Sequence, residues 1–153
     1  MTAMAADIPY FDTSYLARLY LDDHGYAQAR ALADTAVQIT CAWHGQAEVV
    51  AALHRAFRED RLQHDAYAQA LDQFTTDSKD GLFHWLPLGD PVQQRLRTFF
   101  QNASASVFLR AADALHLACA AEHGFTEVYS HDRHFLAAAA HFGVRGLDVI
   151  DPV

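Results

Sequence analysis

Four acidic side chains occupy positions from which they could bind a metal ion. Asp12 follows a short apolar run in YFDTSYLARLY, Asp113 lies inside the apolar segment LRAADALHLACAA, and Asp132 lies in YSHDRHF. Glu48 lies near the start of a helix-like pattern, in WHGQAEVV. Oxygen ligands without matching His or Cys select a hard ion, Mg2+ or Mn2+. Such an ion can activate water to hydrolyse a phosphodiester without a nucleophile from the protein.

Two of these acids have an equally ordinary structural explanation. Asp12 and Asp132 each lie at the start of an expected helix. An aspartate there is a favoured N-cap that stabilises the helix by about 1 kcal/mol. Taken singly, each is better explained as a cap. If Asp12 instead binds a metal, Thr13 becomes the better candidate for the capping role.

The local sequence favours a functional role for Asp113 but not for Glu48. An aspartate inside so apolar a helix is costly unless it is paired or bound to a metal, which favours a functional Asp113. The alternative is an exposed Asp113 near the helix start, paired with Arg110. Glu48 lies across its helix from a stripe that contains Val50 and Leu53, so periodicity alone places it in solvent.

Short β-type runs alternate with longer helical segments along the chain. This alternation predicts an α/β layer fold with a mainly parallel sheet, whose carboxyl edge would collect the acids. The expected strands are 8–11, 37–42, 83–86, 127–129 and 147–150. The expected helices are 13–21, 26–33, 46–61, 66–74, one that begins at 90, 109–123 and 132–142.

Length and charge narrow the class of protein. A chain of 153 residues favours one domain, which we place at 1–153. Its net charge of -8 argues against non-specific binding to nucleic acid or to an anionic membrane, although metal-bound carboxylates would offset part of it. No signal peptide or membrane span is evident, and Cys41 and Cys119 resemble reduced, buried thiols. We therefore expect a cytoplasmic protein without membrane contact.

Other chemistries find less support in the sequence. There is no HExxH or paired Cys/His framework, so a zinc site is disfavoured despite the ten histidines. His116 follows Asp113 by one helical turn, and a satisfied core histidine is the favoured interpretation over a site residue. Neither cysteine has the context of a nucleophile, and there is no phosphate-binding glycine-rich loop.

Four segments together resemble the motifs of PIN-domain ribonucleases, and more narrowly those of the toxins of VapBC-type toxin–antitoxin pairs. The segments are YFDTSYLARLY, TCAWHGQAEVVAALHR, LRAADALHLACAAEHG and VYSHDRHF, in family order and covering nearly the whole chain. The resemblance implies a three-layer α/β/α sandwich around a parallel sheet of about five strands, which is a PIN-like, Rossmann-like architecture.

The resemblance also implies roles for individual residues. Asp12, Glu48, Asp113 and Asp132 match the acidic set that binds Mg2+, with Mn2+ as a substitute, and that catalyses cleavage. Thr13 and Ser130 match small hydroxyl residues beside the acids, where a hydrogen bond within the site and ordinary capping are equally good explanations.

The implied function is a Mg2+-dependent endoribonuclease toxin, typically a homodimer, that is silenced by a small antitoxin protein. The alternative is a PIN-like scaffold that binds RNA or protein without cutting it, because the surface is acidic and no basic groove is evident. Seven arginines could supply local positive charge, although ion pairs with nearby acids are the more ordinary role of each. They are Arg55, Arg58, Arg61, Arg95, Arg97, Arg110 and Arg133.

Overall fold

The computed structural model describes residues 8–153, so residues 1–7 of the expected single domain lie outside the described part. The elements, in chain order, are α2 (Thr13–Ala17), α3 (Tyr26–Asp34), β1 (Ile39–Ala42), α4 (Gly45–Arg58), α5 (His64–Lys79), β2 (Phe83–Leu86), α6 (Asp90–Asn102), α7 (Ala111–Glu122), β3 (Glu127–Tyr129), α8 (Arg133–Ala138), the 3-10 helix η1 (Ala139–Phe142) and β4 (Arg145–Leu147). Within residues 8–153, no helix is both long enough and apolar enough to cross a membrane.

The strands form two parallel ladders, in which β1 pairs with β2 and β3 pairs with β4. The segment at Tyr10 and Phe11 joins them through isolated parallel bridges, Tyr10 to Thr40 and Phe11 to Tyr129. The expected combination of parallel strands and helices is therefore present. The strands of the described residues do not form one continuous five-stranded sheet. The first strand is cut short because Pro9 has no N–H to donate and α2 begins at Thr13.

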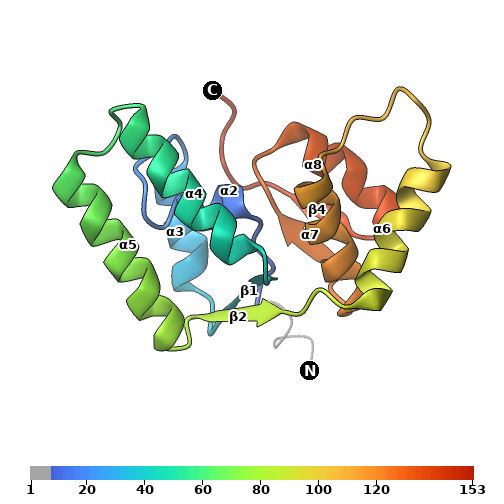
Figure 1. Ribbon diagram of the computed structural model, residues 1–153, viewed down its shortest axis with the longest axis horizontal. Helices are drawn as coiled ribbons and strands as arrows, with labels where there is room; N and C mark the ends of the chain where they lie inside the picture. Colours follow the sequence, from blue (N-terminus) through green and yellow to red (C-terminus); the bar gives the residue numbers. More distant parts are fainter. Residues whose placement is uncertain (1–7) are drawn as a thin grey trace.

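Tyr10 and Phe11, which we call the linking segment, direct their side chains into two separate hydrophobic cores. Tyr10 packs with residues of α6, α7 and α8, whereas Phe11 packs with residues of α2, α4 and α5, because successive side chains of an extended segment point to opposite faces. Figure 1 shows the corresponding arrangement, with α3, α4 and α5 gathered on one side of the molecule and α6, α7 and α8 on the other. The linking segment therefore lies where the two halves meet.

The buried face of α4 differs from the expected one. Val49, Leu53 and Ala56 are fully buried, whereas Val50 is 43% exposed. The expected stripe was therefore rotated by about one residue, or about 100° around the helix axis. Glu48 lies beside the true buried face, not across from it, and this rotation brings its side chain toward the linking segment and α7.

The last strand also differs from its prediction, because β4 ends at Leu147 instead of beginning there. Its central residue, Gly146, packs against α8, where an added Cβ would lie 2.8 Å from the Leu136 side chain. A glycine within a three-residue strand removes the apolar alternation by which a strand is recognised. The following segment carries Asp148, which accepts a hydrogen bond from the Tyr15 hydroxyl at 2.7 Å.

Gly25 holds this C-terminal segment against the N-terminal cap of α3, and we expect Gly25→Ala to destabilise the protein by about 2–4 kcal/mol. Its φ of +84° disfavours a side chain, and an added Cβ would lie 2.3 Å from Ile150. Gly81→Ala is the matched control, because Gly81 has a φ of +82° with nothing within 4 Å of the added Cβ. Urea unfolding would measure both; an equal loss in the two variants would contradict the packing role of Gly25.

Candidate metal and catalytic site

Asp12 is a buried carboxylate held by hydroxyl groups. It is 3% exposed, and its Oδ1 accepts from Ser14 Oγ at 2.5 Å and from the Tyr15 amide at 3.3 Å. Its Oδ2 accepts from Ser130 Oγ at 2.5 Å. Burial raises the pKa of Asp12 to about 6, against the lowering effect of the Ser130 and Ser14 hydrogen bonds. Asp12 is thus strongly desolvated, and a bound cation would relieve this cost.

Asp12 is also the N-cap of α2, through the bond from the Tyr15 amide. The expectation that Thr13 would take over capping is therefore wrong. An N-cap aspartate keeps extended backbone angles, so the end of a short strand and the start of a helix place the same side chain at the sheet edge. Capping and metal binding are geometrically compatible here.

Ser130 connects Asp12 to Asp132. Its hydroxyl donates to Asp12 and accepts from the Asp132 amide at 3.0 Å, so the turn after β3 is fixed against the start of α2. Asp132 is the N-cap of α8, because its Oδ1 accepts from the Phe135 amide at 2.9 Å. Its other oxygen, Oδ2, lies 3.3 Å from Nη2 of Arg110, whose Nε also lies 3.5 Å from Asp113.

Asp113 lies in the first turn of α7, with a side chain that is 14% exposed. Its Oδ2 is buried and accepts no hydrogen bond from residues 8–153; Arg110 Nε lies 3.5 Å away. Burial raises the pKa of Asp113, and the nearby charges of Asp132 and Glu48 raise it further, whereas Arg110 lowers it. The pairing with Arg110 that belonged to the alternative interpretation occurs, but the exposure that this interpretation required does not, because the carboxylate is largely buried and incompletely satisfied.

Glu48 lies in the first turn of α4 and contacts the site, although periodicity had placed it in solvent. Its Oε1 accepts from Thr13 Oγ1 at 2.8 Å and lies 2.6 Å from His116 Nε2. Burial alone would raise the pKa of Glu48, but the bonds from His116 and Thr13 outweigh it and lower the pKa. Glu48 is therefore held as a carboxylate.

His116 fixes this arrangement from within the core. It is 1% exposed, and its Nδ1 lies 2.7 Å from the Tyr10 hydroxyl, which in turn accepts from the Ala42 amide at 3.2 Å. A chain of contacts thus runs from the β1 backbone through Tyr10 and His116 to Glu48. The favoured interpretation of His116 as a satisfied core histidine holds, yet the residue also positions a candidate site residue.

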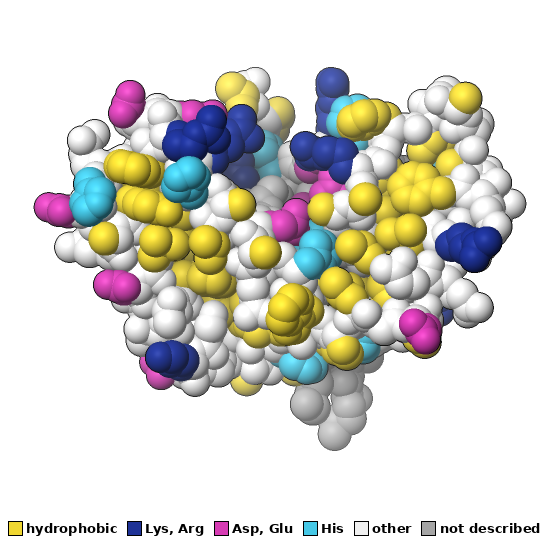
Figure 2. Space-filling model, in the orientation of Figure 1, with side chains coloured by type: hydrophobic (Ala, Val, Ile, Leu, Met, Phe, Trp, Pro, Cys, Tyr) yellow, Lys and Arg dark blue, Asp and Glu magenta, His cyan; other side chains and the backbone are white. Residues whose placement is uncertain are grey.

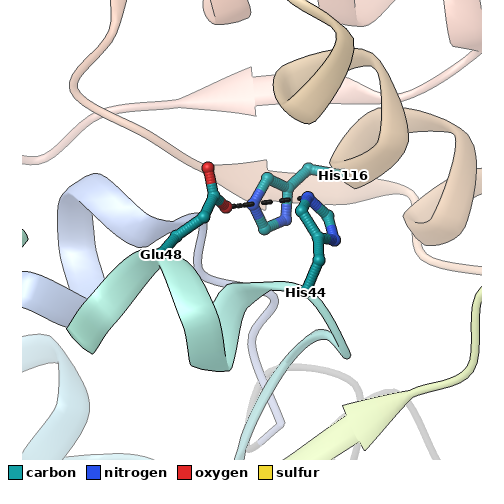
Figure 3. A group of neighbouring side chains, drawn as sticks. All are labelled: His44, Glu48 and His116. Carbon is teal, nitrogen blue, oxygen red and sulfur yellow. Dashed lines mark hydrogen bonds and ion pairs between the residues drawn. The ribbon is translucent and has the colours of Figure 1, made fainter. Parts of the chain in front are cut away.

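His44 is a neighbour that the sequence interpretation did not single out. Its ring centroid lies 4.2 Å from that of His116, and its Nε2 lies 3.6 Å from Glu48 Oε1 (Figure 3). Burial, followed by the charge of His116, lowers the pKa of His44, which favours the neutral imidazole. His44 and Glu48 are four residues apart on one helix face, and this spacing was the available signal in the sequence.

Contacts with neighbouring residues link the four predicted acids. Ser130 bonds to both Asp12 and Asp132, and Arg110 pairs with both Asp132 and Asp113. Thr13, which follows Asp12 in the chain, donates to Glu48. Figure 2 shows acidic side chains near the centre of this face, with Lys and Arg side chains along the upper edge on either side of them. Carboxylates gathered beside cationic margins can bind a divalent ion and a phosphate group bridged to it.

Comparison with known proteins agrees with this architecture. The family model described as PIN domain matches residues 10–141, whereas no curated protein matches the chain in sequence. Among solved structures, VapC20 of Mycobacterium tuberculosis, described as a sarcin-ricin loop cleaving toxin, has a TM-score of 0.66 at 19% identity. That match covers 86% of this chain and 94% of VapC20.

A second solved structure is VapBC-5 of Mycobacterium tuberculosis, a member of the VapBC family of toxin-antitoxin systems. Its TM-score is 0.64 at 18% identity, with 94% of this chain and 99% of that chain covered. Identity this low shows a shared fold. The family model spans most of the chain, from the linking segment into η1, and the chain therefore belongs to the PIN domain family.

Proposed function

We propose that this protein is a Mg2+-dependent endoribonuclease and the toxin of a type II toxin–antitoxin system. Asp12, Glu48, Asp113 and Asp132 would hold Mg2+, or Mn2+ in its place. The observation that carries the proposal is that contacts through Ser130, Arg110 and Thr13 link four carboxylates from separate elements of a PIN domain. One of these carboxylates, Asp113, has a buried oxygen with no hydrogen-bond donor within residues 8–153.

The donor set fits a hard divalent cation. Burial raises the pKa of Asp113, and the charge of Asp132 raises it further, so the Asp113 carboxylate lies beside a repelling charge. A cation among the acids would replace this repulsion with attraction and would give Asp113 Oδ2 a close partner, because Arg110 Nε approaches it only to 3.5 Å. When bound, such an ion activates water and stabilises developing charge on phosphate oxygens.

The residues around the acids orient them. Ser14 and Ser130 fix the two oxygens of Asp12, and Thr13 with His116 fixes Glu48. These contacts match the roles expected for the hydroxyls Thr13 and Ser130, which remain proposals. Partners of this kind set the direction of a ligand and typically change metal affinity or activity by about 10- to 100-fold.

Arg110 is the best-placed cation for substrate phosphate. Its side chain is 67% exposed and lies between Asp113 and Asp132, at 3.5 Å and 3.3 Å. Other arginines form ion pairs away from the four candidate site acids. Arg55 and Arg61 pair with Glu59, and Arg95 pairs with Glu122. A guanidinium at the edge of the site would offset the acidic surface locally.

We also propose the partners and location usual for such toxins: an RNA substrate, a small antitoxin protein, a second copy of the chain and a cytoplasmic location. The two VapBC-type folds support this assignment. The helices on both sides of the strands support a three-layer α/β/α sandwich, in which the linking segment completes a five-stranded sheet.

Asp12→Asn should reduce RNA cleavage by at least about 100-fold, because it replaces a charged ligand at the centre of the proposed site. Purified protein would be incubated with total RNA and Mg2+ or Mn2+, with and without EDTA. Asp72→Asn, the same substitution at an exposed position on α5, is the control. Cleavage that ignores EDTA, or that survives Asp12→Asn, would overturn the proposal; RNA binding without cleavage by wild type would favour the scaffold alternative.

The free energy of unfolding of the metal-free protein should fall as pH rises from about 4 to about 7. This fall should be about 3 kcal/mol larger in wild type than in Asp12→Asn. The pKa of Asp12 rises from 3.8 to about 6 on folding, so the folded state binds the proton more tightly. The stabilisation of the folded state by protonated Asp12 is fully present below pH 3.8 and is lost as pH rises through about 6. Denaturant unfolding in EDTA measures it, and saturating Mg2+ should flatten the difference. Parallel curves for the two proteins in EDTA would contradict the desolvation of Asp12.

A further inference from the structure

Beside the oxygen-rich site lies a second group of metal-ligand atoms, supplied by His44, Glu48 and His116. One ligand atom from each residue lies within 4.8 Å of the others. Figure 3 shows His44 and Glu48 projecting from the first turns of α4 toward His116. Two imidazoles and one carboxylate form the donor set of Zn2+ and similar transition ions, whereas Mg2+ prefers oxygen ligands alone.

The distances leave a small adjustment for such an ion. In four-coordinate zinc, bonds of about 2.0–2.1 Å place neighbouring ligand atoms about 3.3 Å apart. His44 Nε2 and Glu48 Oε1 are 3.6 Å apart, close to this value, but Nε2 also donates to the Ala112 carbonyl at 2.9 Å, so a bound ion must replace that hydrogen bond. His116 Nε2 and Glu48 Oε1 are 2.6 Å apart across a shared proton, and this contact must open by less than about 1 Å when an ion replaces that proton.

The surroundings of His116 select Nε2 as its candidate ligand atom, although a bound ion must displace a firmly held proton: burial lowers the pKa of His116, but Cys41 and Glu48 outweigh it and raise the pKa to about 10. Its Nδ1 faces the buried Tyr10 hydroxyl at 2.7 Å, so an Nδ1–H can donate to the Tyr10 oxygen and leave the Nε2 lone pair for a metal. Histidines that bind metals commonly donate their other ring N–H in this way, which fixes both tautomer and orientation. Tyr10 is itself anchored by the Ala42 amide.

Gly45 permits the close approach that forms this group. An added Cβ there would lie 2.5 Å from Cys41 Sγ and 3.6 Å from His116 Cε1. The first turn of α4 can therefore pack directly on β1 and α7 only because this residue has no side chain. His44 is the residue before it. Its Nδ1 is buried without a hydrogen-bond partner among residues 8–153, whereas its Nε2 lies near Glu48 and the Ala112 carbonyl.

We propose that His44, Glu48 and His116 form a binding site for a transition-metal ion such as Zn2+, distinct from the Mg2+ site and sharing only Glu48 with it. Water would complete the coordination, because Glu48 is partly exposed at 29%. An ion held here would draw Glu48 away from Asp12 and Asp113. Zn2+ would therefore inhibit the nuclease, a consequence that rests on the proposed function.

Zn2+ binding to the full chain tests the site directly. Calorimetric titration with ZnCl2 would be run on protein freed of Mg2+, because Mg2+ would compete for the shared Glu48. We expect His44→Ala and His116→Gln to weaken Zn2+ binding by at least about tenfold. His54→Ala, an exposed histidine on the same helix, should bind as wild type does. Asp12→Asn should also retain Zn2+ binding, because Asp12 is no ligand of this site.

Equal Zn2+ affinity in wild type and His44→Ala would overturn the proposal, as would binding that Asp12→Asn abolishes and His44→Ala retains. Co2+ gives an independent readout, because tetrahedral coordination with nitrogen ligands produces strong visible absorption that His44→Ala should remove. RNA cleavage then separates the two proposals. Wild type that binds Zn2+ but never cleaves RNA would contradict only the proposed function, whereas cleavage without Zn2+ binding would contradict only this site.

Discussion

The burial of the Asp12 carboxylate at the junction of the two ladders is the constraint on which the rest of the site depends. A carboxylate that is 3% exposed is costly unless donors or cations compensate it. Ser14 and Ser130 compensate part of this cost, and both also fix the backbone of the turn after β3. The same contacts that satisfy Asp12 therefore bring the start of α8, with Asp132, to the start of α2.

The direction of the strands explains why acids from distant parts of the chain meet. Parallel strands end at a common edge, and the helices that follow them begin there. Asp12 and Asp132 follow such strand ends, whereas Glu48 and Asp113 lie in the first turns of α4 and α7. Helix N-termini also carry partial positive charge, which lowers the cost of gathering carboxylates before any ion binds.

Glu48 connects two different donor chemistries. On one side lie the carboxylates of Asp12, Asp113 and Asp132, and on the other lie the imidazoles of His44 and His116. The contact chain from Ala42 through Tyr10 to His116 holds Glu48 from the core side, so its position depends on the packing of β1 against α7. Substitutions at these buried positions would therefore change the position of Glu48 although the substituted residues do not contact substrate.

The sequence by itself determined the α/β class, most helix positions and strands β2 and β3, because these follow from local periodicity and capping. It also nominated the four acids as candidate site residues, through the order of its motifs. It placed Glu48 in solvent and Thr13 at a cap, and it did not single out His44. Only the tertiary structure decided these points, because the rotation of α4 and its approach through Gly45 depend on Cys41 and His116. The short linking strand likewise depends on partners at Thr40 and Tyr129, which lie far away along the chain.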